Sequence, residues 1–304
     1  MSPGGRFSHY ELQALVGRGG MAEVFRAVDL AGPRAGQKVA IKRLLPELAK
    51  NSEYVELFVG EADLSRMLHH PNIVEVYEAG TVGEQYYMAM EYIDGRDLGQ
   101  IVKRCRERKI LLPIDFAVFL TVALLDALAY AHSAASPTGK PLGIVHCDIS
   151  PSNLFISRVG EIKLGDFGIA KANAHDDLQG ETPVWGKAYY LSPEALEGRV
   201  APAEDLWAAT VTLYELLTNE RPFTGADPDA VGAAIRKALP KRLRAVRPEI
   251  SAGLDEAAMR GFARDPRQRY PDAASFAAAL RPHFDELIGN PMAIASVVRG
   301  LFGA

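Results

Sequence analysis

The sequence predicts an α+β fold in which a strand-rich first third precedes a longer helical part. Residues 9–45 alternate apolar and polar side chains and are interrupted by glycines, a pattern typical of strands joined by tight turns. Beyond Gly95 the apolar residues take helical spacing instead. The 304 residues are 48% hydrophobic and 24% charged, which is enough for a sizeable core. The change of pattern predicts a boundary near residues 93–97.

Within the first part, apolar side chains with helical spacing predict one helix over residues 53–68. Short apolar runs predict two further strands, at residues 73–77 and 86–92.

The second part is expected to be mostly helical. Its most apolar stretch, 116–131, is too short to cross a bilayer comfortably and carries Asp126, so it is predicted to be a buried helix. Prolines and glycines predict a surface loop over 133–143. The predicted helices lie at 114–132, 204–218, 228–239, 252–263 and 271–287.

Composition argues against several classes of protein. A formal net charge of −4 gives no sign of a nucleic-acid-binding surface. The two cysteines, Cys105 and Cys147, cannot form a disulfide framework, which is typical of a reducing compartment. Residues 1–8 contain no apolar run and do not read as a signal peptide. A cytoplasmic protein without a transmembrane segment is therefore expected.

A glycine-rich segment, VGRGGMAEV at residues 16–24, lies between two strand-like stretches. Glycines let a backbone approach phosphate groups closely and offer N–H donors to their oxygens. Taken alone, the segment could equally be an ordinary hairpin turn.

Two segments farther along place oxygen-bearing side chains at fixed spacing. The first is HCDISPSN at 146–153, and the second is Asp166-Phe167-Gly168, thirteen residues later. Hard cations prefer oxygen ligands, and charge on a transferring phosphoryl group needs cations. Asn153 and Asp166 can supply such ligands.

With VAIK at 39–42 between them, these segments resemble the signature set of the eukaryotic-type (Hanks-type) protein kinases. The glycine-rich loop and Pro151 look like bacterial serine/threonine members of that family. Further resemblances lie at 88–92 (hinge), 192–194 (A-P-E motif), 205–207 (D-x-W) and 264–269, so the likeness covers residues 9–289.

The resemblance implies a bilobal protein-kinase fold that binds Mg-ATP between its lobes. Residues 1–93 would form a small N-lobe with an antiparallel sheet and one main helix. Residues 94–289 would form a larger helical C-lobe. Residues 290–304 would be a tail, and their apolar spacing suggests a short docked helix.

The resemblance also implies which residues bind nucleotide. Lys42 would hold the α- and β-phosphates with Glu61 as its helix partner, although either side chain alone is more often a solvated charge. Met90 would line the adenine pocket, a position equally suited to plain core packing. The backbone from Glu91 to Ile93 would read the adenine edge, and Asp97 would face the ribose. The other nucleotide-binding residues carried over are Val16, Gly17, Gly19, Gly20, Val24, Ala40 and Phe155.

For the transfer step, the resemblance implies that Asp148 orients the acceptor hydroxyl and accepts its proton. Asn153 and Asp166 would bind Mg²⁺, with Mn²⁺ as another possible metal. The acceptor would be a serine or threonine of a protein substrate, which could be the chain itself. The resemblance further predicts a buried, structural ion pair between Glu194 and Arg269.

Three residues depart from the family pattern. Cys147 replaces an arginine that normally binds an activation-loop phosphate. Ser150 replaces the catalytic-loop lysine, and Lys187 replaces the threonine that normally bonds to that lysine. The hydroxyl and the ammonium thus look exchanged, and a lysine stem can deliver a point charge from the neighbouring position. Lys187 is therefore predicted to act at the site together with Ser150.

Two other functions remain open at this stage. The missing lysine would suit a pseudokinase that binds ATP and transfers little phosphate. A small-molecule phosphotransferase of related fold would share the catalytic Asp and Asn, but would lack the Glu194–Arg269 pattern.

Overall fold

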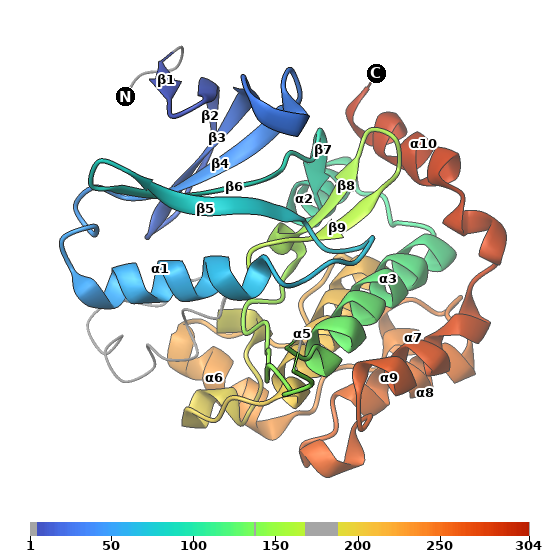
Figure 1. Cartoon of the computed structure of the whole chain (residues 1–304). Helices are drawn as coiled ribbons and strands as arrows, with labels where there is room; N and C mark the ends of the chain where they lie inside the picture. The colour runs from blue at the N-terminus through green and yellow to red at the C-terminus, as the bar shows by residue number, and fades with distance from the viewer. Residues whose placement is uncertain (1–4, 137, 168–187, 304) are drawn as a thin grey trace. The chain divides into compact units, whose positions relative to one another are not determined.

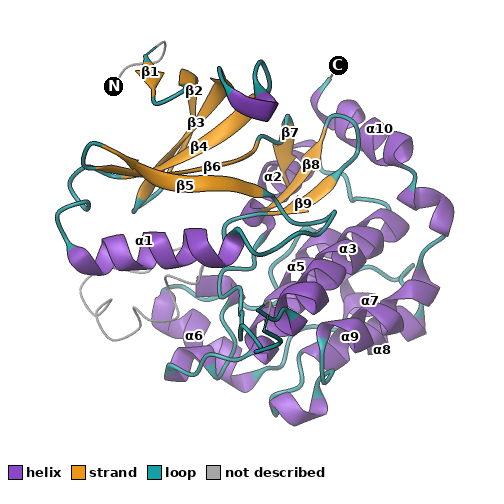
Figure 2. Cartoon of the chain, in the orientation of Figure 1, coloured by secondary structure: helices purple, strands orange, loops and turns teal. Residues whose placement is uncertain are grey.

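The computed structural model describes residues 5–136, 138–167 and 188–303, and the chain divides into two compact units, Met1–Ile93 and Asp94–Ala304. Strands dominate the first unit and helices the second (Figure 2). The α+β class predicted from the sequence is confirmed.

In the first unit, six strands form one sheet in the order β1-β2-β3-β4-β6-β5, with every pairing antiparallel. The helix α1 (Ser52–Ser65) belongs to the same unit (Figure 1), and the Asn51 side chain caps it by accepting from the Glu53 N–H. The strands are β1 (Arg6–Phe7), β2 (Tyr10–Arg18), β3 (Ala22–Asp29), β4 (Lys38–Leu44), β5 (Val76–Val82) and β6 (Gln85–Glu91).

Each face of the sheet carries a buried apolar cluster. Cross-strand partners share a face, and side chains alternate between faces along each strand. Ile41 pairs with Phe25 and with Ala89, and all three lie in one buried cluster. On the opposite face, Leu44 and Met88 pack with Phe58 and Ala62 of α1. Lys42, one residue from Ile41, therefore faces α1.

The second unit is built around α3 (Ile114–Ser133) and α5 (Pro202–Thr218), which pack on each other. A small antiparallel sheet in the order β7-β8-β9 belongs to the same unit. Its strands are β7 (Gly95–Asp97), β8 (Leu154–Ser157) and β9 (Ile162–Leu164), and the other helices are α2 (Leu98–Arg108), α6 (Pro228–Lys237), α7 (Leu243–Val246), α8 (Ala252–Gly261), α9 (Ala273–Leu280) and α10 (Pro291–Phe302).

Helix α3 is longer than the apolar stretch predicted from the sequence. The helix has 20 residues, so it is long and apolar enough to span a membrane, contrary to the estimate made on residues 116–131. Its most apolar window is 67% buried inside the structure. The buried-helix prediction is confirmed, although for packing reasons and not because of length.

Other elements also differ from the sequence-based prediction, and the strands β7, β8 and β9 were not predicted. The strand expected at 73–77 begins only at Val76 and runs to Val82, and the buried Ile73 and Val74 belong to the preceding connection. The helix expected over 271–287 ends at Leu280, shortly before Pro282, which has no N–H to donate. Helix α2 was not predicted.

The C-terminal helix α10 packs against α2 and β8. Ile294, Ala295, Val298 and Leu301 bury its apolar face. The turn between β8 and β9 lies close to Pro291, the first residue of α10. Gly160 in this turn has φ +89°, and a Cβ there would lie 2.0 Å from the Pro291 carbonyl oxygen. Only glycine fits this contact.

We expect Gly160→Ala to destabilise the second unit more than Gly198→Ala. Both glycines have positive φ, but Gly198 has open space around its missing Cβ. Left-handed strain alone costs roughly 1–2 kcal/mol, and the overlap with Pro291 should add roughly 1–3 kcal/mol. Urea unfolding of both variants measures the difference. Equal losses would show that the turn tolerates a methyl group beside α10.

Candidate active site

The first unit places Lys42 of β4 opposite Glu61 of α1. The Lys42 Nζ lies 2.6 Å from Glu61 Oε1, and the two side chains are only 13% and 10% exposed. An ion pair this short and this shielded fixes the ammonium group better than a solvated pair would. The alternative that both are ordinary surface charges is therefore wrong.

Several residues expected to bind nucleotide share the sheet face of Lys42. Val24 of β3 is its cross-strand partner, and Ala40 pairs with Met90 of β6. Met90 also packs on the cluster beneath α1, so its core-packing role is confirmed. The sheet register thus gathers Val24, Ala40 and Met90 on the face that carries the ammonium.

The glycine-rich segment is the β2–β3 hairpin, in which Gly17 pairs with Val24. Gly19 donates its N–H to the Ala22 carbonyl at 2.8 Å. Val16 is 51% exposed and Gly20 is also exposed, so a ligand can reach the segment.

The segment expected to read adenine follows the end of β6. The Glu91 N–H already donates to the Glu75 carbonyl at 2.8 Å. A base would therefore be read by the Glu91 carbonyl or by Ile93, which lies beyond the strand.

In the second unit, Asp205 holds the predicted catalytic loop from the first turn of α5. Its carboxylate is 1% exposed and accepts the backbone N–H groups of His146 at 2.8 Å and Cys147 at 2.9 Å. The His132 Nε2–H donates to the same group at 2.8 Å. Cys147 has φ +61°, an uncommon conformation for a residue with a side chain, and the bond to Asp205 stabilises it.

His146 orients the same loop from inside the unit. Its Nε2–H donates to the Gly165 carbonyl at 3.1 Å, while Nδ1 accepts from the Asp148 N–H at 3.3 Å. Complete burial lowers the pKa of His146, so the ring is neutral and can do both. The ring also lies 4.5 Å from that of Phe167, next to Asp166.

Asn153 links directly to the Asp148 side chain. Its Nδ2 donates to the Asp148 carbonyl at 2.8 Å and to Asp148 Oδ2 at 3.1 Å. With the nitrogen used in this way, Asn153 Oδ1 is the atom left to face a cation. Asp166, at φ +52°, follows β9, and Gly165 donates its N–H to the Asn153 carbonyl at 2.9 Å.

This donor set fits Mg²⁺. Asn153 and Asp166 offer hard oxygen atoms, and Mg²⁺ is usually held by one or two carboxylates together with substrate phosphates. Among the described residues, no group of three or more His, Cys, Asp or Glu side chains forms a separate metal site.

Ser150 lies two residues after Asp148, and the side chain is 5% exposed. Its Oγ has no hydrogen-bond partner within the described part of the chain. A buried hydroxyl without a partner is costly and calls for an explanation. Lys187 and Gly168 fall outside the described residues.

Asp97 has a structural task as well. Its Oδ1 accepts the Gln100 N–H at 2.8 Å and so caps α2, and burial raises the pKa of Asp97. The pair Asp97–Gln100 before an apolar run is a capping signal that the sequence reading missed. Phe155 is the cross-strand partner of Asp97.

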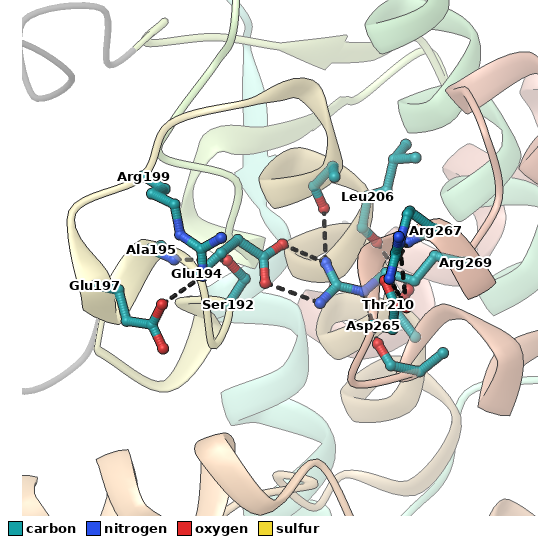
Figure 3. A network of polar contacts seen from close by, with 12 residues as sticks. Ser192, Glu194, Ala195, Glu197, Arg199, Leu206, Thr210, Asp265, Arg267 and Arg269 are labelled. Atoms are coloured by element: carbon teal, nitrogen blue, oxygen red, sulfur yellow. Dashed lines mark hydrogen bonds and ion pairs between the residues drawn. The ribbon is translucent and has the colours of Figure 1, made fainter.

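The Glu194–Arg269 ion pair predicted from the sequence is confirmed. The Arg269 guanidinium binds the Glu194 carboxylate in a bidentate geometry (Figure 3). The Nη1–Oε1 distance is 2.5 Å and the Nη2–Oε2 distance is 2.9 Å. Arg269 is 1% and Glu194 5% exposed. Arg269 also donates to the carbonyls of Ala263 and Ala203 and lies over the Trp207 ring.

A further buried acid, Glu204, lies near this pair. Glu204 is 4% exposed, and its Oε2 has no hydrogen-bond partner among the residues the structure describes. Burial, followed by the charges of Asp205 and Glu194, raises the pKa of Glu204 to about 8. Glu204 is therefore mostly protonated at neutral pH.

The pair Glu194–Arg269 can be tested by breaking it from one side. Arg269→Met leaves a buried carboxylate without its partner and should lower the free energy of unfolding by about 3–5 kcal/mol. The double change with Glu194→Gln should cost less than the two single changes added together. Urea unfolding reports this, with exposed Arg267→Met as the control. Additive losses would contradict a direct pairing.

The raised pKa of Glu204 predicts how stability depends on pH. The folded state holds this proton up to about pH 8, whereas the unfolded chain releases it near 4.5. Between these values the folded state binds more protons, so the free energy of unfolding falls as pH rises, by up to roughly 1.4 kcal/mol per unit. Glu204→Gln should remove this contribution and stabilise the protein at pH 8–9.

The measurement is urea unfolding at several pH values. Exposed Glu256→Gln controls for the loss of a surface carboxyl. An unchanged slope in Glu204→Gln would mean that this carboxyl is ionised in the fold.

The model of the protein kinase domain family matches residues 10–277. A tyrosine-protein kinase of Myxococcus xanthus, MasK, is 35% identical over 98% of this chain and 46% of its own length. A probable serine/threonine-protein kinase of Streptomyces coelicolor, SCO3848, is 36% identical over 99% of this chain and 43% of its own. PrkC of Bacillus subtilis, a serine/threonine-protein kinase, is 32% identical over 91% and 40%.

Solved structures of protein kinases have a similar fold. The PknI kinase domain of Mycobacterium tuberculosis superposes with a TM-score of 0.68 at 26% identity, covering 93% of this chain and 99% of that one. A Rad53 fragment crystallised with AMP-PNP gives a TM-score of 0.70 at 23% identity over 88% and 64%, which supports the fold alone. The chain spans less than half the length of the curated relatives named above. Because the family model matches residues 10–277, most of the 304 residues, this chain belongs to the protein kinase domain family.

Proposed function

We propose that this chain is the catalytic domain of a serine/threonine protein kinase, which transfers the γ-phosphoryl group of Mg-ATP to a protein hydroxyl. The observation that carries the proposal is the Asn153–Asp148 hydrogen bond in a loop fixed by Asp205. This bond holds the Asp148 carboxylate in place, and in the proposal that carboxylate accepts the proton of the acceptor hydroxyl.

In this mechanism each residue has a defined task. The acceptor oxygen forms a bond to the γ-phosphorus while the bond to the ADP oxygen breaks, and Asp148 takes the hydroxyl proton. Lys42, held by Glu61, neutralises charge on the α- and β-phosphates. The backbone of the glycine-rich hairpin donates to phosphate oxygens. Bound Mg²⁺, held by Asn153 and Asp166, would stabilise the charge that develops on the phosphates.

Asp148→Asn tests this proposal. The amide cannot accept the proton, so turnover should fall by roughly 10²–10⁴, while nucleotide affinity stays nearly the same. Lys42→Ala should instead weaken nucleotide binding. The readouts are phosphate transfer to a generic protein substrate and titration with a non-hydrolysable ATP analogue. Exposed Asp229→Asn is the matched control. Wild-type turnover in Asp148→Asn would refute the assignment, and no transfer by the wild type would favour a pseudokinase.

A second candidate concerns the acceptor. The relative MasK is named a tyrosine-protein kinase and matches 98% of this chain. We retain serine and threonine, because Pro151 stands in the loop and the Ala-Ala-Arg-Asn ending of tyrosine kinases is absent. Phosphoamino acid analysis of the product decides between them. A protein substrate, autophosphorylation and a cytoplasmic location remain predictions.

Ser150 supports a further part of the proposal. We propose that Lys187 supplies the cation that other family members place at position 150, and that the buried Ser150 hydroxyl bonds to it. Lys187→Ala should then lower turnover by about 10²–10³, the usual loss for one transition-state donor. The double change Ser150→Lys with Lys187→Thr should recover much of that loss. Unchanged turnover in Lys187→Ala would exclude the exchange.

A further inference from the structure

A small cavity opens in the second unit where α10 meets the β7–β8–β9 sheet, and its volume is about 120 Å³. Three arginines from three separate segments line it. Arg96 belongs to β7, Arg158 to the β8–β9 turn and Arg299 to the last turn of α10. Val298 and Phe302 of α10 form its apolar wall, and these elements adjoin in Figure 1.

The three guanidinium groups are only partly compensated. Arg158 Nε pairs with Asp94 Oδ1 at 3.2 Å, in an exposed ion pair of small worth. Arg96 donates to the Gly95 carbonyl at 3.3 Å and lies 5.2 Å from the Phe302 ring centroid. Across the described residues, no carboxylate forms an ion pair with Arg96 or Arg299. The cavity is thus positive, although the chain carries a formal net charge of −4.

Other arginines nearby are already committed, which sets these three apart. Arg104 of α2 donates to the Leu301 carbonyl at 3.2 Å, and Arg108 donates to the Gly300 carbonyl at 3.1 Å. These bonds satisfy carbonyls at the C-terminal end of α10. Together with the contact between Gly160 and Pro291, they hold the helix in place beside the cavity. The backbone segments that carry the three arginines are therefore held together before any ligand arrives.

We propose that this cavity, the Arg96–Arg158–Arg299 cavity, binds a phosphomonoester dianion carried by a phosphorylated serine or threonine side chain. Guanidinium groups match phosphate oxygens with paired donors, and a phosphorylated residue offers three strong acceptors. The volume resembles that of a cavity of about 150 Å³ that holds one benzene molecule. It suits a phosphate group with a short stem and is too small to enclose a whole nucleotide. Val298 and Phe302 would contact the stem.

Because the ligand would touch α10 and the sheet at once, it would stabilise the docked helix. The inference goes beyond phosphate transfer, since binding can be measured whether or not the chain is active.

Calorimetric titration at constant ionic strength tests it, with a non-hydrolysable ATP analogue in excess so that the nucleotide site is filled. The probes are a short phosphoserine peptide, the same peptide without phosphate, and inorganic phosphate. The phosphopeptide should bind at one site, and the unphosphorylated peptide should not bind. Arg96→Gln, Arg158→Gln and Arg299→Gln should each weaken binding roughly tenfold or more, the value of one charge-assisted hydrogen bond. Exposed Arg244→Gln, in α7, should not.

Amide hydrogen exchange gives an independent readout of the place. The phosphopeptide should slow exchange in α10 of the wild type and leave it unchanged in the triple arginine variant. Wild-type affinity in the triple variant, or equal binding of the unphosphorylated peptide, would overturn the proposal. Inorganic phosphate binding as tightly as the phosphopeptide, with the same dependence on the arginines, would overturn the choice of a phosphorylated side chain and assign the cavity to free phosphate.

Discussion

The buried carboxylate of Asp205 is the contact on which the catalytic half of the second unit depends. A buried charge must be paired, and Asp205 is paired with two backbone N–H groups of the catalytic loop and with His132. If the catalytic loop moved away from α5, the buried Asp205 carboxylate would lose its two backbone hydrogen bonds. Asp148 is fixed along with the loop, because its N–H donates to the His146 ring and its carboxylate accepts from Asn153.

Several acidic side chains lie close together at the start of α5. Glu204 and Asp205 lie in its first turn, where the helix dipole favours negative charge, and Glu194 lies nearby. Arg269 neutralises Glu194. Glu204 has no such partner among the described residues and keeps its proton instead. Three carboxyl groups thus share a buried region: hydrogen bonds compensate Asp205, an arginine compensates Glu194, and Glu204 keeps a proton, at a stability cost that appears only as pH rises.

In the first unit, the alternation of side chains along β4 determines where Lys42 lies. Ile41 enters one core cluster, so Lys42 must face α1, where Glu61 meets it. A register slip of one residue would send the lysine to the opposite face and bury it without a partner. The apolar packing of the sheet and the position of the ammonium are thus one constraint.

The sequence by itself determined the α+β class and most of the long helices, and it predicted the boundary near residue 93 and the candidate site residues, because hydrophobic periodicity and motif order are local properties of the chain. It could not reveal the carboxylate of Asp205 beneath the loop, 57 positions after Asp148 in the sequence, or the capping role of Asp97. Pro282 ended a helix that periodicity alone had extended. The raised pKa of Glu204 and the arginine-lined cavity beside α10 were decided only by tertiary structure, because burial and charge proximity depend on which distant segments pack together.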